Sequence, residues 1–363
     1  MIARVTIPIP FSILIAADET LPIFSVERMG YKISHFPPLR DTNLVSQVEP
    51  SILKLNEKDA ILCNLIVIDF QKEEFDRTIS SDPSKMFQFE PPLEFINQVL
   101  NDFLIRLRHL TNAPQIHYIN LHYTQWQIKY LKNDGSEFQE ESGKLRGRGT
   151  KTFEIKHVPL PSDIWSDIFE LPQDFFSQYW IDLLLDGLDE LPEIGPSIVL
   201  THTALEVFIA KILNQLATAE KISPEFWEWI NNRRYPDQLP TIEEKYDTLL
   251  QNLTGHTLKE DTKLWSVFQN LRTARNTFVH EGIAKISLKS QAPPLTRDEA
   301  RNLVILSNMI PYKIREWLPK SVQWELNKNY NTKSFSTWPM DFQRPGKVVN
   351  SAGFPIPPGS VLH

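Results

Sequence analysis

A short segment in the second half of the chain carries the side chains best suited to chemistry. Arg275 and Asn276 are adjacent, and His280 follows four residues after Asn276. In a helix, Arg272, Asn276 and His280 would share one polar ridge at intervals of four residues, with Arg275 at the border of an apolar face. Imidazole exchanges a proton near neutral pH, and guanidinium presents paired donors to phosphate oxygens. The segment therefore predicts proton transfer beside a phosphate group.

This combination of side chains suits the cleavage of RNA. The RNA 2′-hydroxyl can attack the neighbouring phosphate if a base removes its proton and a cation stabilises the charged transition state. The reaction needs no metal ion or other cofactor, and DNA lacks the attacking hydroxyl. We therefore expect RNA as the partner and substrate, with no metal site and no cofactor.

Helices must position these side chains, and the signals for their ends are clear. Gly255 and Gly282 stand where helices would end. Three threonine–glutamate pairs fit the capping box that opens a helix, namely Thr241 and Glu244, Thr257 and Glu260, and Thr296 and Glu299. The pattern predicts helices over 173–189, 196–219, 224–233, 241–254, 260–281 and 297–317, with a kink at Pro311.

The motif and the order of these helices resemble the HEPN family (higher eukaryotes and prokaryotes nucleotide-binding domains). That family carries an arginine and a histidine separated by four to six residues, usually with a polar residue directly after the arginine. Arg275, Asn276 and His280 match this pattern. The helices upstream carry Ala204-Leu205-Glu206 and Lys245-Tyr246, as the family's order requires. The resemblance covers about residues 172–318.

The resemblance implies an all-α bundle that acts as a metal-independent endoribonuclease with a composite site in a homodimer. His280 would be the acid and base, Arg275 would stabilise the phosphate and the transition state, and Asn276 would position the substrate. Glu206 would orient the arginine, and Arg272 would help to bind RNA. The family also implies a role as a toxin or in antiviral defence. Some relatives are non-catalytic modules that bind nucleotide or protein, and this alternative stays open.

The first 160 residues show a different pattern and no recognised family. Asn133-Asp134-Gly135 supplies the chemistry of a hairpin turn. Stretches rich in β-branched residues predict strands, and one apolar stretch at helical spacing predicts a helix; the strands cover 2–15, 59–70, 116–131 and 152–158, and the helix covers 93–110. We therefore expect an α+β fold here, and a domain that restrains the ribonuclease or binds a regulatory partner or ligand.

The whole chain is thus predicted to have three regions. An α+β N-terminal domain covers 1–160, and an all-α HEPN-like helical bundle covers 161–318. A proline-rich extended tail covers 319–363.

Two segments of the first domain offer other chemistry. A basic loop carries Lys144, Arg146 and Arg148, which could bind RNA phosphates or form a solvated hairpin loop. Glu154 and Lys156, twenty residues after Asp134, loosely match the carboxylates and lysine of magnesium-dependent nucleases. Asp134 already has an explanation in the predicted turn, so this is the weakest of the hypotheses.

Composition and charge narrow the classes of function. The chain has 363 residues, of which 41% are hydrophobic and 23% charged, a balance that predicts more than one globular unit. Its net charge of −7 argues against sequence-blind binding of duplex DNA through charge alone. The chain has no GxxxxGK[ST] and no GxGxxG motif, which excludes the Walker and Rossmann nucleotide sites.

The single cysteine and the hydropathy pattern bear on the compartment. Cys63 has no partner for an intrachain disulfide, which predicts a reducing, cytoplasmic location. A membrane span needs about 20 consecutive apolar residues, and we expect none here.

Overall fold

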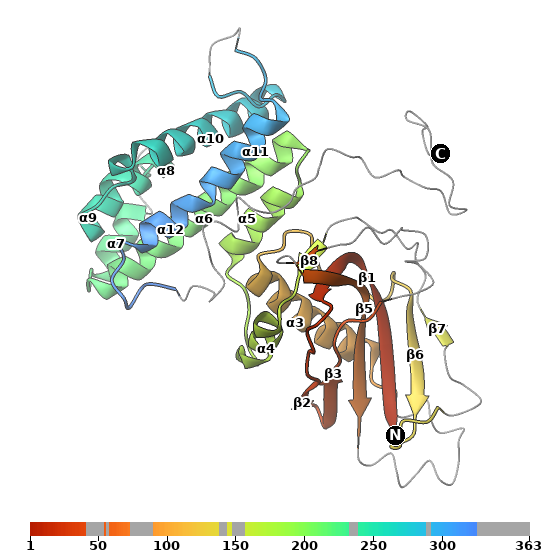
Figure 1. Cartoon of the computed structure of the whole chain (residues 1–363). Coiled ribbons are helices and arrows are strands. Elements are labelled where there is room, and N and C mark those ends of the chain that lie inside the picture. Colours follow the sequence, from red (N-terminus) through yellow and green to blue (C-terminus); the bar gives the residue numbers. More distant parts are fainter. Residues whose placement is uncertain are drawn as a thin grey trace.

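A computed structural model describes residues 1–40, 54–55, 58–72, 90–137, 144–146, 157–231, 239–287 and 292–324. The described residues form two parts, a mostly antiparallel sheet with two helices and a helical bundle (Figure 1). This arrangement confirms the predicted order, in which an α+β part is followed by a helical part.

The sheet is built around one long central strand. β1 pairs with β5 on one side and with β6 on the other, both antiparallel, and β8 joins the far end of β1 in parallel. The path through the sheet runs β2-β3-β5-β1-β6-β7, with β4 paired to β5. The strands are β1 (Ile2–Ala16), β2 (Phe24–Arg28), β3 (Tyr31–His35), β4 (Lys54–Leu55), β5 (Lys58–Gln71), β6 (Trp126–Leu131), β7 (Lys144–Arg146) and β8 (His157–Pro159).

The alternation of buried side chains along β1 decides which face of the sheet meets the core. Val5, Ile7 and Ile9 are buried, whereas the residues between them are only partly covered or exposed. α3 (Leu93–Thr111) covers this face with an apolar stripe that includes Leu100 and Leu107. The predicted strands over 2–15 and 59–70 and the predicted helix over 93–110 are therefore confirmed, with ends shifted by one residue.

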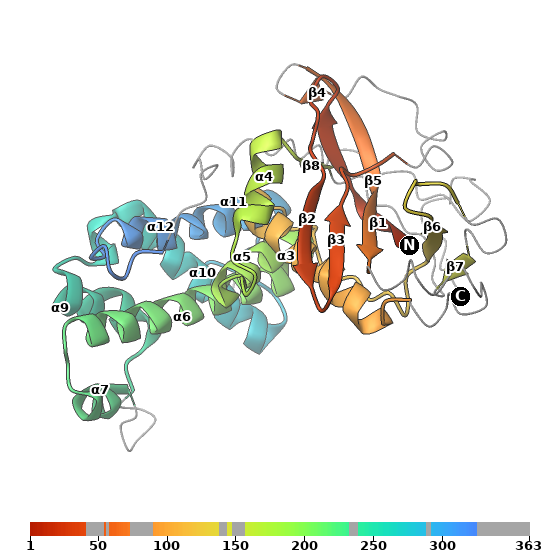
Figure 2. The same ribbon diagram turned by 90° about the horizontal axis from the view of Figure 1, so that it is seen from below.

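The sheet part extends beyond its predicted boundary at residue 160. α4 (Ser162–Glu170) packs on α3, and its Trp165 is fully buried in the first core. Arg106 of α3 fixes the end of α4 by donating hydrogen bonds to the carbonyl oxygens of Ile168 (3.1 Å) and Leu171 (2.8 Å). These contacts join residues far apart in sequence and hold α4 on the first core, whereas the sequence pattern predicts one helical domain over 161–318. Figure 2 shows α4 beside β2 and α3.

Two other predicted elements differ from the structure. The strand over 116–131 is confined to β6, because Asn101 of α3 holds the preceding segment through both backbone groups of Ile119, at 2.8 and 2.9 Å. The helix over 173–189 begins only at α5 (Tyr179–Asp189). Of the strand predicted over 152–158, β8 contains the last two residues, and 152–156 lie outside the described residues.

The helical part surrounds one central helix, α6 (Ile194–Ala219). α5, α10, α11 and the turn at Tyr246 all pack against α6. The other helices are α7 (Pro224–Asn231), α8 (Ile242–Glu244), the π-helical turn η3 (Lys245–Leu249), α9 (Leu250–Thr254), the short 3-10 helix η4 (Leu258–Glu260), α10 (Thr262–Glu281), α11 (Arg297–Ser307) and α12 (Met309–Arg315).

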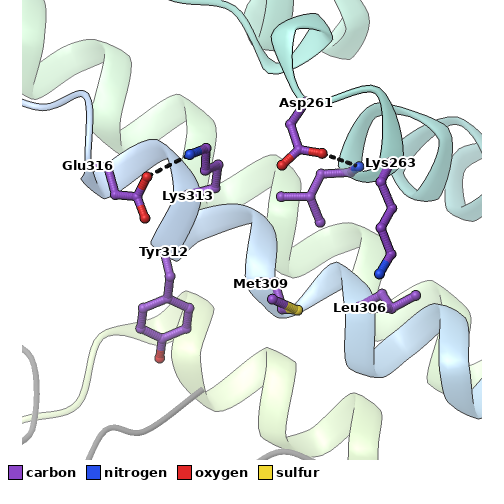
Figure 3. A pocket seen from close by; sticks show the side chains of 8 residues that line it. Asp261, Lys263, Leu306, Met309, Tyr312, Lys313 and Glu316 are labelled. Carbon is purple, nitrogen blue, oxygen red and sulfur yellow. Dashed lines mark hydrogen bonds and ion pairs between the residues drawn. The ribbon is translucent and has the colours of Figure 1, made fainter. Parts of the chain in front are cut away.

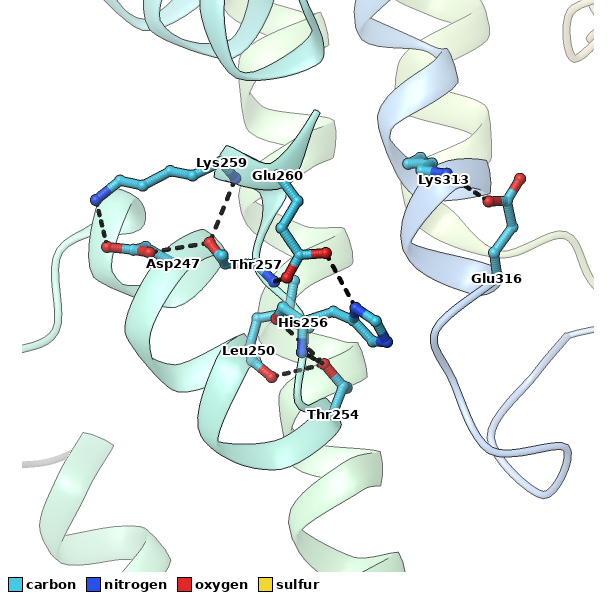
Figure 4. Close-up of polar contacts among 9 residues, drawn as sticks. All are labelled: Asp247, Leu250, Thr254, His256, Thr257, Lys259, Glu260, Lys313 and Glu316. Carbon is cyan, nitrogen blue, oxygen red and sulfur yellow. Dashed lines mark hydrogen bonds and ion pairs between the residues drawn. The ribbon is translucent and has the colours of Figure 1, made fainter. Parts of the chain in front are cut away.

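Local signals set the ends of these helices, as the sequence predicts. All three predicted capping boxes are formed. In the second of them, the Thr257 hydroxyl also donates a hydrogen bond to Asp247 (2.9 Å; Figure 4). Gly255 and Gly282 end α9 and α10 with φ of 80° and 73°, values that favour glycine. The helix expected over 297–317 is broken at Asn308, three residues before Pro311, which cannot donate a backbone hydrogen bond.

α6 is also long and apolar enough, by length and composition alone, to cross a membrane. In its most apolar window, 56% of the residues are buried inside the protein. The central helix of a soluble bundle has this composition because neighbouring helices cover it on several sides. α6 is therefore compatible with a soluble protein.

Ion pairs join the sheet part to the helical part. Arg108 of α3 donates a hydrogen bond to Asp186 of α5 at 2.5 Å and another to the carbonyl oxygen of Pro114 at 3.3 Å. His117 lies 2.9 Å from Asp189 at the end of α5. The side chain of Arg108 is only 13% exposed, so this contact is partly shielded from water.

Candidate functional site

The residues predicted to do chemistry lie on α10. Leu271 and Ala274 are fully buried in the second core, which confirms the predicted apolar face. Arg275 and Asn276 are half-buried at the border of that face, and His280 is exposed in the last turn. The helix therefore presents a guanidinium, an amide and an imidazole along one side, with its apolar side against the bundle.

The contacts of these three side chains leave most of their polar atoms available. The guanidinium of Arg275 donates a hydrogen bond to the side-chain oxygen of Asn276 at 3.1 Å. No described residue forms a hydrogen bond or an ion pair with His280. An exposed imidazole within two turns of a largely unpaired guanidinium can meet a ligand that approaches from solvent.

A second helix faces this ridge from inside the bundle. α6 places His202 one turn before Glu206, with Nδ1 of the imidazole 3.7 Å from a carboxylate oxygen. The side chain of His202 is 3% exposed, whereas that of Glu206 is 42% exposed. Burial, and then the positive charges of Arg275 and Arg272, lower the pKa of His202 to about 4. The imidazole is therefore buried, neutral at physiological pH and within the electrostatic influence of both arginines of α10.

Sequence reasoning missed His202, although one signal was available. His202 precedes Glu206 by four residues, so any helix that aims Glu206 at α10 also brings His202 to the same face. The resemblance implies that Glu206 orients Arg275, but the two side chains form no ion pair among the described residues. The carboxylate lies near the buried imidazole instead.

Tyr246 supports α6 directly behind this face. Its hydroxyl donates a hydrogen bond to the carbonyl oxygen of Leu205 at 2.8 Å, and its side chain is completely buried. Burial, together with the negative charge of Glu206, raises the pKa of Tyr246. The π-helical turn that carries Tyr246 widens the helix locally, a feature found often beside functional sites.

Close packing fixes the spacing between α6 and the motif end of α10. A Cβ atom on Gly195, in the first turn of α6, would lie 2.0 Å from the ring of Phe278. The segment after α10 folds back onto it, because the amide of Lys285 donates to the hydroxyl of Thr277 at 2.9 Å. The two helices therefore present their polar side chains at a defined separation.

The other residues predicted to bind RNA lie elsewhere or are already paired. Arg272 forms an ion pair with Glu243 and a hydrogen bond of 3.3 Å with Gln269. Lys144 and Arg146 belong to β7 at the edge of the sheet, far from α10 in Figure 1. Arg148 lies outside the described residues.

The structure gives one residue of the magnesium hypothesis, Asp134, another role, and it does not describe the other two, Glu154 and Lys156. Asp134 accepts hydrogen bonds from the Ser136 hydroxyl (2.6 Å) and amide (2.9 Å), and these bonds lower its pKa. This contact stabilises the predicted hairpin turn. Glu154 and Lys156 lie outside the described residues. Within the described part of the chain, no three histidine, cysteine, aspartate or glutamate side chains gather as a metal site would require.

Two cavities of the helical part lie away from these residues. One, of about 170 Å³, lies at the opposite end of α10, beside Asp261 and Tyr312 (Figure 3). The other, of about 450 Å³, lies between α6 and α7 beside Trp227. The last turn of α10 carries the exposed side chains of Val279 and His280, and an exposed surface suits an extended polymer better than a small enclosed ligand.

No protein-family model, curated protein or solved structure matches this chain.

Proposed function

We propose that this chain is a metal-independent endoribonuclease of the HEPN type, located in the cytoplasm. The supporting observation is that one helix carries an exposed His280 and an Arg275 with unused donors, while the adjacent α6 carries His202 and Glu206. A site of this kind offers a proton acceptor and a cation to a phosphodiester without enclosing it.

The proposed reaction assigns one role to each side chain of α10. His280 takes the proton of the 2′-hydroxyl, whose oxygen attacks the adjacent phosphorus. The bond to the 5′-oxygen then breaks, and the protonated His280 gives its proton to that oxygen, which leaves a 2′,3′-cyclic phosphate and a 5′-hydroxyl end. Arg275 donates hydrogen bonds to the phosphate oxygens as their charge grows, and Asn276 positions them.

A second copy of the chain would complete the site. Val279, Ile283 and Ile286 are 52%, 44% and 46% exposed around the end of α10. Exposed aliphatic side chains beside a polar ridge fit a protein interface. We therefore propose a homodimer through this end of α10, with the two His280 side chains near each other, and a toxin or antiviral role for the assembly.

The cleavage test compares wild type with Arg275→Ala/His280→Ala. Both proteins are incubated with cellular RNA in excess chelator, and the termini of the products are identified. We expect wild type to produce cyclic phosphate ends and the double variant to lose at least about 100-fold in rate, the usual range for removing an acid–base group. A 2′-O-methyl oligonucleotide should resist both proteins.

Two outcomes of this test would contradict the proposal. Equal cleavage by both proteins would assign the activity to a contaminant or to another site. Cleavage that stops when magnesium is chelated would favour a metal-dependent mechanism.

The exposed aliphatic side chains also favour a second function, a non-catalytic module that binds protein or nucleotide. In that case neither protein would cleave RNA. Val279→Asp would abolish self-association or partner binding, whereas Arg275→Ala would have little effect on either.

A further inference from the structure

His202 is an unusual side chain for the interior of a helical bundle. It is almost fully buried, yet neither ring nitrogen has a hydrogen-bond partner among the described residues. Buried polar groups are nearly always paired, so an unpaired one needs an explanation. We find an explanation in two charged side chains, because Glu206 can accept a hydrogen bond and Arg275 can donate one.

Glu206 lies on one side of the imidazole. Its carboxylate oxygen is 3.7 Å from Nδ1, just beyond hydrogen-bond distance and within reach of a small side-chain rotation. An ionised carboxylate can only accept hydrogen bonds, so Nδ1 must carry the proton for the two groups to bond. That bond would leave Nε2 as an acceptor.

α10 packs closely against the first turns of α6, at Gly195 and Phe278, and the charges of its Arg275 and Arg272 act on the imidazole. Only one of these two arginines is available. Arg272 is held by Glu243 and Gln269. Arg275 has one hydrogen bond within the described part of the chain, to Asn276, and a guanidinium has five N–H donors. An acceptor at Nε2 would therefore offer a partner to a guanidinium that still has unused donors within the described part of the chain.

We propose that His202 is a positioning residue that links Glu206 to Arg275. Its Nδ1–H donates to Glu206, which fixes the tautomer, and its Nε2 accepts a hydrogen bond from the guanidinium as Arg275 turns toward a phosphate. Glu206 thus orients the arginine through the imidazole and not by direct contact. The catalytic consequence rests on the proposed ribonuclease function, but the hydrogen-bonded arrangement does not.

The charge state of the imidazole agrees with this role. Burial and the two arginines keep the ring neutral at physiological pH, and only a neutral imidazole has an acceptor. Carboxylates fix the tautomer of histidines beside metal ions and catalytic serines in the same way.

The tautomer of His202 can be measured without any activity. The full chain is labelled with ¹⁵N-histidine, and long-range proton–nitrogen spectra are recorded near pH 7. The signal of His202 is identified by its loss in His202→Gln. We expect the Nδ1–H tautomer in wild type and a shift toward the Nε2–H tautomer, which free imidazole prefers, in Glu206→Ala. The Nε2–H tautomer in wild type, or no change in Glu206→Ala, would overturn the proposal.

The catalytic consequence is tested with two substitutions of His202. His202→Phe keeps the ring volume without polar atoms, and His202→Gln keeps an acceptor at the distance of Nε2. We expect His202→Phe to lower kcat by about 10- to 100-fold, as lost supporting residues do, with KM changed less than about twofold. His202→Gln should retain more activity than His202→Phe.

A control separates this role from a structural one. The phenyl ring fills the same buried space, and the partly exposed Glu206 can bond to water in place of the imidazole, so we expect the Tm of His202→Phe to stay close to that of wild type. If His202→Phe is folded and cleaves RNA like wild type while Arg275→Ala does not, the link between His202 and Arg275 is wrong. If wild type itself cleaves no RNA, the ribonuclease function fails, and the tautomer measurement still decides the arrangement of His202.

Discussion

At the scale of single residues, burial controls the charge of two histidines, one in each core. His202 is buried on α6, and His35 packs against the rings of Phe103 and Phe169. Burial lowers the pKa of each to about 4, and nearby arginines contribute in the same direction. Both histidines are therefore neutral in the folded protein at pH 5 and above, whereas an exposed histidine gains its proton near pH 6.5.

This difference predicts that the protein loses stability in mild acid. Between pH 6.5 and pH 4 the unfolded chain binds protons that the folded protein excludes, so the free energy of unfolding falls as the pH falls. Each histidine should contribute a loss of about 2–3 kcal/mol between pH 7 and pH 4.5. Urea unfolding of the full chain at pH 7 and at pH 4.5 measures this loss in the free energy of unfolding. His202→Gln should abolish one of the two contributions, and an unchanged pH dependence in that variant would contradict the explanation.

The residues of the site were predictable only in part. The sequence pattern places Arg275, Asn276 and His280 on one helix, because helical spacing is a local property. The relation of His202 to Arg275 depends on how α6 packs on α10, and periodicity along one helix says nothing about which neighbour it meets. The resemblance implies that Glu206 orients Arg275, and the structure places the carboxylate of Glu206 3.7 Å from the imidazole of His202 on the same helix.

At the scale of elements, the contact between Gly195 and Phe278 controls how closely α6 approaches α10. An added methyl group at Gly195 would overlap the ring of Phe278, so we expect Gly195→Ala to lower the free energy of unfolding by about 1–3 kcal/mol. In a Phe278→Ala background the ring is absent, so Gly195→Ala should leave the free energy of unfolding almost unchanged. Chemical denaturation of the four proteins in this cycle measures the coupling, and additive effects would show that the ring is not the obstacle.

Elements with local signals were predicted well, and elements fixed from a distance were not. The three capping boxes and the two terminal glycines lie within a few residues of the ends that they define. In contrast, the segment before β6 is held by Asn101, and the end of α4 is held by Arg106. Each of these side chains acts on backbone more than fifteen residues away, which no short window of sequence contains.

At the scale of the whole molecule, the pair of Arg108 and Asp186 couples the sheet part to the helical part. Asp186→Asn keeps the shape of the side chain and removes its charge. We expect it to lower the free energy of unfolding by about 1 kcal/mol, because the carboxylate is 37% exposed and water screens the pair. Calorimetry of the full chain should show two transitions that are further apart than in wild type.

The control for this prediction is Glu316→Gln, which removes the ion pair between Glu316 and Lys313. Lys313 lies in α12, and Glu316 is the first residue after that helix. That carboxylate is 64% exposed, and the pair joins residues of the same part. We expect no separation of the transitions in this variant. If both variants behave alike, or if Asp186→Asn behaves like wild type, the coupling between the two parts lies in other contacts.

The burial of Cys63 has a practical consequence for the homodimer proposed above. The thiol is 3% exposed, and burial raises its pKa to about 11, so thiol-specific reagents at neutral pH find little reactive thiolate. A cysteine introduced at the exposed Val279 would then be the single labelling point of the chain, one residue from His280. A spin label attached there would report the distance between the motif helices of two copies in solution, with the native cysteine left in place.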